Sequence, residues 1–251
     1  MSASSSQPVS KRAGLTLLEV LIAVTLVSLL SAAGLVALRI GLNAMERSNS
    51  RLMGNRRALG AQRALEQQIA GFMPVTADCS QGNPAGPGVR IPFFQGEPDA
   101  MRFVSSYSLE EASRGLPRIL EYQVIAGEEG EGVRLVVTEY LYSGPRSTGS
   151  FCLGFGPDPM LGVTMPRWLP ARPGPQSFVL ADKLAFCRFS YRESLQVPPY
   201  ERWHARWTLP RWPTALRIEM TPLRPDRARL LPMSIAVPLR AQKDPMVSYA
   251  E

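Results

Sequence analysis

The sequence has few of the residues that carry most enzyme chemistry. It contains one histidine, His204, and three cysteines with no CxxC pair. One histidine leaves little basis for a Ser-His-Asp triad or a histidine-rich metal site, and the cysteine spacing is not that of a zinc site. No phosphate-binding loop occurs, and Gly154-Phe155-Gly156 is an isolated fragment of a glycine motif. We therefore expect a protein that is not an enzyme, with no catalytic residues, no cofactor, no metal and no small-molecule substrate.

Long hydrophobic runs are also rare, and one stretch dominates. The 24 residues from Leu15 to Leu38 contain a single ionisable side chain, Glu19. As a helix this stretch would span roughly 36 Å, enough to cross a hydrocarbon core of about 30 Å. A carboxylate inside such a helix costs roughly 2.5–3.5 kcal/mol on insertion scales. We therefore expect Glu19 to have a specific cationic partner.

The residues before this run resemble a leader rather than a folded segment. Met1–Gly14 is polar and rich in serine, with Lys11 and Arg12 close to the apolar run. A secretory signal peptide would have an apolar core of only about 7–15 residues, so we expect a retained single-pass anchor. Basic residues stay cytoplasmic, which would place the rest of the chain on the other side of the membrane. Arg39 weakens this asymmetry, and a plain signal anchor is the alternative.

After the apolar run the helical pattern continues but becomes amphipathic. From residue 39 to residue 73, apolar side chains recur at spacings of three, four and seven, which predicts a helix laid against a sheet and ending before Pro74. Glycines within the whole helix either allow close packing or are simply tolerated. The apolar positions are Leu42, Met45, Leu52, Leu59, Leu65, Ile69 and Phe72.

Beyond residue 74 the pattern becomes that of β-strands. Alternating residues in 120–124 and the β-rich run 133–142, joined by a glycine turn, predict a hairpin. Further strands are expected near 101–105, 178–193, 216–220 and 233–237. We therefore predict an α+β fold, with a long N-terminal helix packed on an antiparallel β-sheet domain. The expected divisions are a leader (1–14), a membrane half of the helix (15–38), an amphipathic half (39–73) and a β-rich domain (74–251).

Three features of the β-rich part stay open. The Pro/Gly-rich segment 143–176 either contacts partners or covers the sheet. The acidic turn 128–131 is expected to be solvated, since it lacks the spacing of an EF-hand calcium loop. An exported domain could form one disulfide, and the sequence does not choose the pair among Cys79, Cys152 and Cys187.

The net charge of +7 is compatible with binding to nucleic acid or anionic lipid. The arginines are scattered along the chain rather than clustered, so nucleic acid is not an expected partner.

The stretch Gly14-Leu15-Thr16-Leu17-Leu18-Glu19 resembles the class III signal of type IV pilins and type II secretion pseudopilins. The resemblance implies that a prepilin peptidase cuts between Gly14 and Leu15 and methylates the new amino group of Leu15. Leu15 departs from the phenylalanine that is usual there. Glu19 would be the fifth mature residue, and its carboxylate would pair with the N-terminal ammonium of a neighbouring subunit in a filament.

The order of the C-terminal elements resembles the minor pseudopilin J class of type II secretion systems. It runs from a Tyr-bearing hairpin through a Phe-rich strand (184–191), Trp212-Pro213 and the strand 215–220 to a closing strand ending in Val237-Pro238-Leu239. This resemblance implies an inner-membrane subunit at the tip of a pseudopilus, with other minor pseudopilins, the major pseudopilin and the peptidase as partners. It also implies that the C-terminal domain lies in the periplasm of a Gram-negative bacterium. A minor pilin of a type IV pilus is the alternative, and a pilus-borne adhesin or DNA receptor is a third hypothesis.

Overall fold

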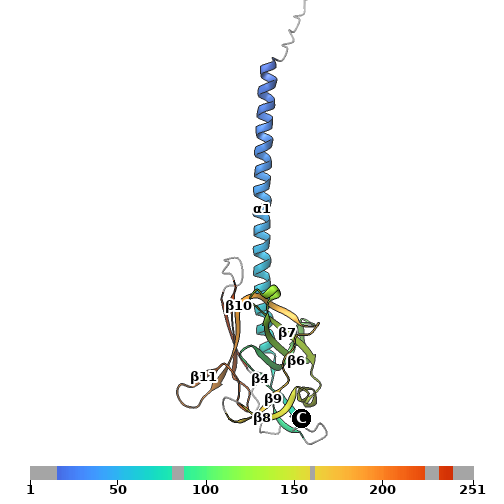
Figure 1. Ribbon diagram of the computed structural model, residues 1–251, viewed down its shortest axis with the longest axis vertical. Helices are drawn as coiled ribbons and strands as arrows, with labels where there is room; N and C mark the ends of the chain where they lie inside the picture. Colours follow the sequence, from blue (N-terminus) through green and yellow to red (C-terminus); the bar gives the residue numbers. More distant parts are fainter. Residues whose placement is uncertain (1–15, 81–87, 159–161, 224–231, 240–251) are drawn as a thin grey trace, which may run out of the picture. The chain divides into compact units, whose positions relative to one another are not determined.

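The structure is a computed structural model that describes residues 16–80, 88–158, 162–223 and 232–239. The chain divides into two compact units, residues 1–52 and 53–251. Helix α1 (Leu17–Ala70) contributes its first part to one unit and its last turns to the other (Figure 1). The predicted leader residues Lys11, Arg12 and Gly14, and Leu15 after the predicted cleavage site, lie outside the described residues.

In the first unit, α1 is apolar and its side chains are exposed. Among the described residues, Leu17–Glu46 is the one helical stretch long and apolar enough to cross a membrane. Its large apolar side chains range in exposure from 48% at Ile22 to 85% at Leu17. A surface this apolar requires lipid or other protein around it.

The second unit is built on an antiparallel sheet, which confirms the predicted α+β, pilin-like fold. Within the described residues the strand order is β1-β5-β6-β7-β10-β12-β13, with β4 beside β5 and β11 beside β10. Two further pairs are β2–β3 and β8–β9. The elements after α1 are β1 (Phe72–Met73), β2 (Thr76–Cys79), β3 (Val89–Pro92), β4 (Gln95–Gly96), β5 (Ala100–Ser108), β6 (Ser113–Ala126), the short 3₁₀ helix η1 (Glu128–Gly130), β7 (Val133–Leu141), α2 (Pro145–Gly149), β8 (Cys152–Pro157), β9 (Thr164–Trp168), β10 (Phe178–Ser194), β11 (Glu201–His204), β12 (Ala215–Pro222) and β13 (Met233–Pro238).

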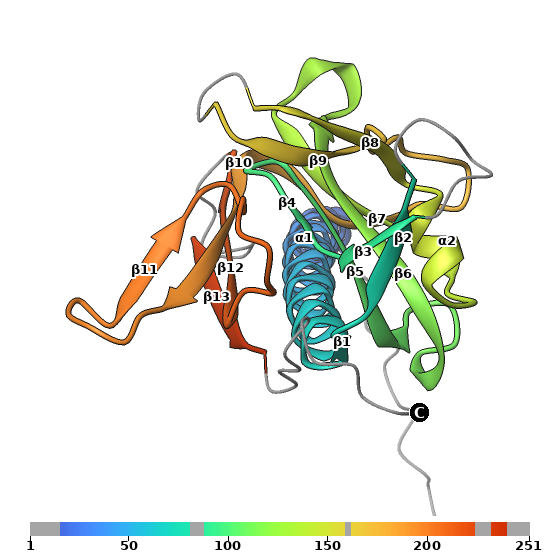
Figure 2. The ribbon, with the colours of Figure 1, turned by 90° about the horizontal axis from the view of Figure 1, so that it is seen from below.

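One face of the sheet buries the last turns of α1. Leu65 and Ile69 have no exposed surface and share one apolar core with Phe103 and Tyr122 of the sheet. In Figure 2, β12 and β13 lie on one side of α1 in this unit, and β5 and β6 lie on the other. The apolar stripe of the sequence is therefore buried only at its end, because Leu42, Met45 and Leu59 are exposed.

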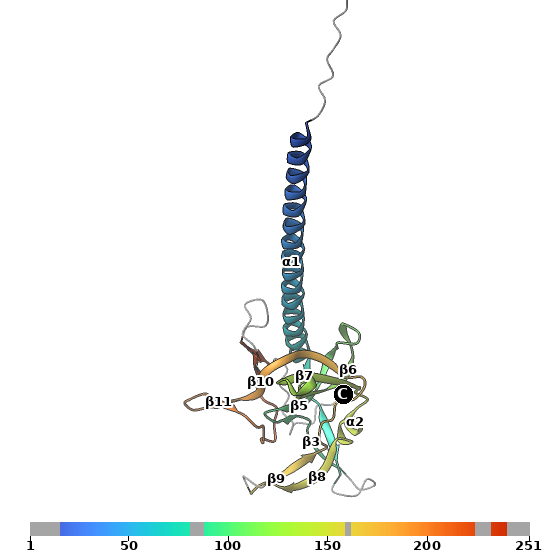
Figure 3. The same ribbon diagram turned by 45° about the horizontal axis from the view of Figure 1, so that its top comes forward.

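The opposite face of the sheet carries a second layer. A smaller core of Phe93, Val104 and Ile119 is completed by Phe151 and Trp168. These two aromatic side chains belong to the Pro/Gly-rich segment 143–176, which contains α2, β8 and β9 instead of being one long loop. Figure 3 shows β8 and β9 as a pair at the bottom of the view, and β8 contacts β2. Of the two alternatives for this segment, covering the sheet is confirmed.

The structure corrects the predicted helix end. Helix α1 ends at Ala70 rather than at residue 73, because Gly71 turns the chain against β5. A Cβ atom at Gly71 would lie 2.6 Å from Ser105 Oγ, so only glycine fits this approach. Phe72 and Met73 then pair with β5 as strand β1.

Strand β10 also departs from the predicted alternation at one position. The alternation in the sequence predicts that Ala185, Cys187, Phe189 and Tyr191 share one face. Of these, Cys187, Phe189 and Tyr191 are buried, whereas Ala185 is exposed. The pairing with β12 shifts register between Leu184 and Phe186, so Leu184 takes the buried position instead.

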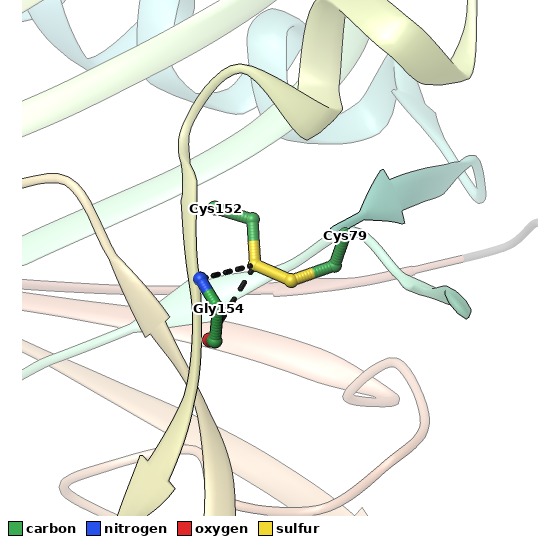
Figure 4. The surroundings of a disulfide bond; sticks show 3 residues. All are labelled: Cys79, Cys152 and Gly154. Atoms are coloured by element: carbon green, nitrogen blue, oxygen red, sulfur yellow. Dashed lines mark hydrogen bonds between the residues drawn. A yellow bond between two sulfur atoms is a disulfide. The ribbon is translucent and has the colours of Figure 1, made fainter. Parts of the chain in front are cut away.

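A disulfide joins Cys79 of β2 to Cys152 of β8 (Figure 4). Both cysteines lie in strands, although the Gly- and Pro-rich sequence around each of them predicts a loop. The Gly154 amide donates to Cys152 Sγ over 3.4 Å. Cys187 is free and buried, and burial raises the pKa of its thiol from 9.0 to about 12, so it stays protonated at neutral pH.

Replacing Cys79 and Cys152 together by alanine should lower the free energy of unfolding by about 2–4 kcal/mol. The bond spans 73 residues, so its loss frees a long loop in the unfolded chain. Urea unfolding of the full chain in detergent micelles, followed by tryptophan fluorescence, measures the change. Reduction of the wild type should reproduce the loss, and reduction of the double variant should add nothing. A wild type whose stability ignores reduction would contradict the prediction.

Candidate functional site

The first turn of α1 is capped by the residue that precedes it. Thr16 Oγ1 accepts from the Glu19 amide at 3.3 Å, and the Thr16 carbonyl accepts from the Glu19 and Val20 amides at 3.0 and 3.3 Å. Thr16 and Glu19 thus occupy the N-cap and N3 positions of the capping-box pattern T-x-x-E. The local sequence of residues 16–19 therefore favours a helix that begins at this point.

Glu19 is the one acidic residue in the first turn of α1. Its carboxylate is exposed, and it has no cationic partner among the described residues. The positive end of the helix dipole favours a negative charge at this position. Leu17, Val20 and Leu21 surround it with apolar surface, so in a membrane this dipole would be its main favourable contact within the chain.

The other end of α1 is fixed to the sheet by a buried polar network. Gln68 has no exposed surface, and its Nε2 donates to Glu139 Oε1 of β7 at 2.8 Å. Tyr122 donates its hydroxyl proton to Gln68 Oε1 in a short hydrogen bond. Burial and the nearby Glu139 carboxylate raise the pKa of Tyr122 well above its ordinary value, which keeps this donor protonated.

Glu139 is a buried carboxylate whose partners are all neutral donors. Besides Gln68, its Oε1 accepts from the Leu109 amide at 2.7 Å, and its Oε2 accepts from Ser108 Oγ at 2.6 Å. Hydrogen bonds to a charged group contribute about 1.5–3 kcal/mol each, which offsets the cost of burying the charge. The Gln68 carbonyl also accepts from Ser105 Oγ at 2.7 Å, so this one turn of helix is held by three strands.

On the covered face, a buried ion pair holds the second layer in place. Arg102 and Glu121 are cross-strand neighbours on β5 and β6, with side chains 1% and 4% exposed. Arg102 Nε donates to Glu121 Oε2 at 2.8 Å, and Nη2 makes a second, short contact with the same oxygen. Its Nη1 donates to Gln95 Oε1 at 2.6 Å. These hydrogen bonds offset part of the cost of burying the two charges.

The segment 143–176, which covers this face of the sheet, binds directly to the Arg102–Glu121 pair. The Leu169 carbonyl accepts from Arg102 Nη2 at 3.1 Å, and the Arg172 amide donates to Glu121 Oε1 at 3.1 Å. The Arg102 guanidinium also lies 4.4 Å from the centre of the Phe151 ring. Because Leu169 and Arg172 supply two of the hydrogen bonds of the pair, moving this segment away would remove those two bonds from buried charged groups.

The comparisons bear on the N-terminal part of the chain. A family model described as the prokaryotic N-terminal methylation motif matches residues 9–35. No curated protein matches the chain. The matched residues include the proposed cleavage site, Glu19 and the apolar first part of α1. The match supports the superfamily of type IV pilins and pseudopilins, and with the apolar helix it indicates a single-pass, membrane-anchored protein.

Sequence reasoning missed several residues that organise these sites. The T-x-x-E pattern around Thr16 could have been recognised from the sequence. Gln68 and Glu139 had no such signal, because they lie 71 residues apart and meet only through tertiary packing. The pairing of Arg102 with Glu121 depends on a strand register that alternation alone does not fix.

Replacing Glu139 by alanine should lower the free energy of unfolding by about 3 kcal/mol, because three buried donors lose their acceptor. Glu139→Gln should also destabilise, since its amide group would face the same donors. Urea unfolding of the full chain in detergent micelles measures both. The matched control is Glu110→Ala, a carboxylate whose side chain is 65% exposed, where a change below about 1 kcal/mol is expected. A Glu139→Ala variant as stable as the wild type would contradict the role of the network.

Proposed function

We propose that this chain is a J-like minor pseudopilin of a type II secretion system. In this role it is a non-enzymatic tip subunit that initiates the pseudopilus, the filament that drives protein export through the outer membrane. The observation that carries the proposal is the methylation motif over residues 9–35, which coincides with an apolar helix containing one carboxylate, Glu19. The α+β fold supports it, because a filament subunit of this superfamily combines such a helix with a β-sheet domain.

Processing prepares the chain for assembly. A prepilin peptidase hydrolyses the peptide bond between Gly14 and Leu15, which frees an ammonium group on Leu15, and a methyl group is then added to this nitrogen. Lys11 and Arg12 leave with the leader. Helix α1 begins just after the new terminus, with Thr16 as its cap.

Glu19 sets the relative offset of neighbouring subunits in the assembled filament. In hydrocarbon an unpaired carboxylate is costly, and the ammonium of a neighbouring subunit neutralises it. Within the described chain, Glu19 has no cation to pair with, so this partner must come from outside it or from the processed N-terminus. An intermolecular pair forms only when neighbouring helices are offset so that one terminus reaches the other carboxylate.

Two features support an orientation with the β-sheet domain in the periplasm. Lys11 and Arg12 precede the apolar helix and favour a cytoplasmic leader. The disulfide between Cys79 and Cys152 suits an oxidising compartment, because disulfides are rare in the cytosol. The proposed partners are other minor pseudopilins, the major pseudopilin, the peptidase and the inner membrane.

A minor pilin of a type IV pilus, serving assembly, adhesion or DNA uptake, shares the same N-terminal chemistry. The order of elements in the C-terminal part, from the β6–β7 hairpin through β10 and β12 to β13, favours the pseudopilin assignment. Loss of secretion on deletion of the gene, with piliation intact, supports the pseudopilin, and the reverse result supports the pilin.

Replacing Glu19 by alanine or valine should leave leader cleavage intact and reduce incorporation into filaments about tenfold or more, the effect of losing at least about 1.4 kcal/mol. The measurement is the ratio of this chain in sheared filaments to that in membranes, by quantitative immunoblot. Glu46→Ala is the matched control, because Glu46 is an exposed carboxylate later in the same helix. Incorporation of the Glu19 variants at the wild-type level would exclude the salt-bridge role.

A further inference from the structure

The outer face of β10, β12 and β13 carries an ordered set of polar and basic side chains. On β12, Arg217 and Glu219 alternate with buried core residues, and so they point away from the core. In the register of the sheet, Ser190 and Ala236 flank Arg217, while Arg188 and Ser234 flank Glu219. Figure 2 shows these strands on the side of the sheet away from β2 and α2.

Two arginines on this face lie over aromatic rings, Arg217 in close contact and Arg188 at the outer limit of a cation–π contact. The Arg217 guanidinium carbon lies 3.8 Å from the centre of the Trp203 ring, and that of Arg188 lies 5.9 Å from the centre of the Phe186 ring. Neither arginine has an ion pair with a carboxylate in the described part of the chain. Stacking holds a guanidinium in one orientation while its N–H groups at the edge stay available for a bidentate acceptor.

The surroundings of these arginines allow a partner to reach them. Ser234 and Ala236 on β13 are small and exposed, so they do not screen Arg217 from that side. Among the described strands, β13 is last in the sheet order. Phe186 remains 42% exposed beside Arg188, which adds an apolar contact to the basic ones.

We infer that this face binds an acidic segment of another protein, with its carboxylates on Arg188 and Arg217 and an apolar side chain on Phe186. Nucleic acid fits the same face less well. Bases need open aromatic faces for stacking, and here guanidinium groups lie over the rings. Glu219 neighbours both arginines and would repel a continuous run of phosphates, whereas separate carboxylates can avoid it. The face belongs to the β-sheet domain, and its binding does not depend on assembly into a filament.

The test measures binding of a fluorescent glutamate-rich peptide to the full chain in nanodiscs, by anisotropy at low and physiological salt. The double variant Arg188→Gln/Arg217→Gln should bind the peptide about tenfold more weakly. The matched control is Arg114→Gln/Arg167→Gln, which removes two exposed arginines from β6 and β9 that have no ion pair within the described residues, and it should stay within about twofold of the wild type.

Three outcomes would overturn the inference. The first is a wild type that does not bind the peptide. The second is an equal loss of affinity in both double variants, which would show only the general attraction of a basic chain. Tighter binding of oligothymidine than of the peptide, lost in the Arg188/Arg217 variant alone, would assign the face to nucleic acid. Arg188→Lys/Arg217→Lys keeps the charge and should still lose affinity several-fold, because lysine lacks the planar donor edge. Unchanged thermal unfolding of each variant confirms that the domain is folded.

Discussion

The packing of the last turns of α1 onto the sheet is the interaction on which the β-sheet domain depends. Leu65 and Ile69 supply apolar surface, and Gln68, on the same turn, is fully buried. A buried amide is tolerated only when its hydrogen bonds are made, and Glu139 and Tyr122 make them. This requirement selects one rotation and one depth of the helix, because a shifted helix would deprive Glu139 of its Gln68 donor and Tyr122 of its acceptor.

A carboxylate in apolar surroundings is costly, and this cost is offset in different ways at the two ends of α1. At the sheet, Glu139 obtains three neutral donors from its own chain. At the other end, Glu19 has a cap for its amide and no cation for its carboxylate within the described residues. The same physical rule that explains the hydrogen bonds of Glu139 underlies the proposal that Glu19 pairs with another subunit. The segment 143–176 covers the opposite face of the sheet, and the Cys79–Cys152 disulfide joins it to β2. Together they complete a domain whose internal polar groups are largely hydrogen-bonded.

Much of the fold could be predicted because its signals are local. Alternation located β6, β7 and the buried face of β10, and the apolar run located the first part of α1. The misses arose where a tertiary contact overrides a local pattern. The close approach of Gly71 to β5 ends the helix early, and the register shift after Leu184 exposes Ala185. The ion pair of Arg102 with Glu121 could not be predicted, since it depends on which residues of two strands face each other.

The central claim is that this chain is processed and assembled as a member of the pilin superfamily. Mass spectrometry of the N-terminal peptide, from membranes with and without the prepilin peptidase, tests it most directly. The account predicts a peptidase-dependent terminus at Leu15 carrying an N-methyl group. An intact leader beginning at Met1 in both samples would contradict it, and the chain would then be a signal-anchored β-sheet domain without the assembly role proposed for Glu19.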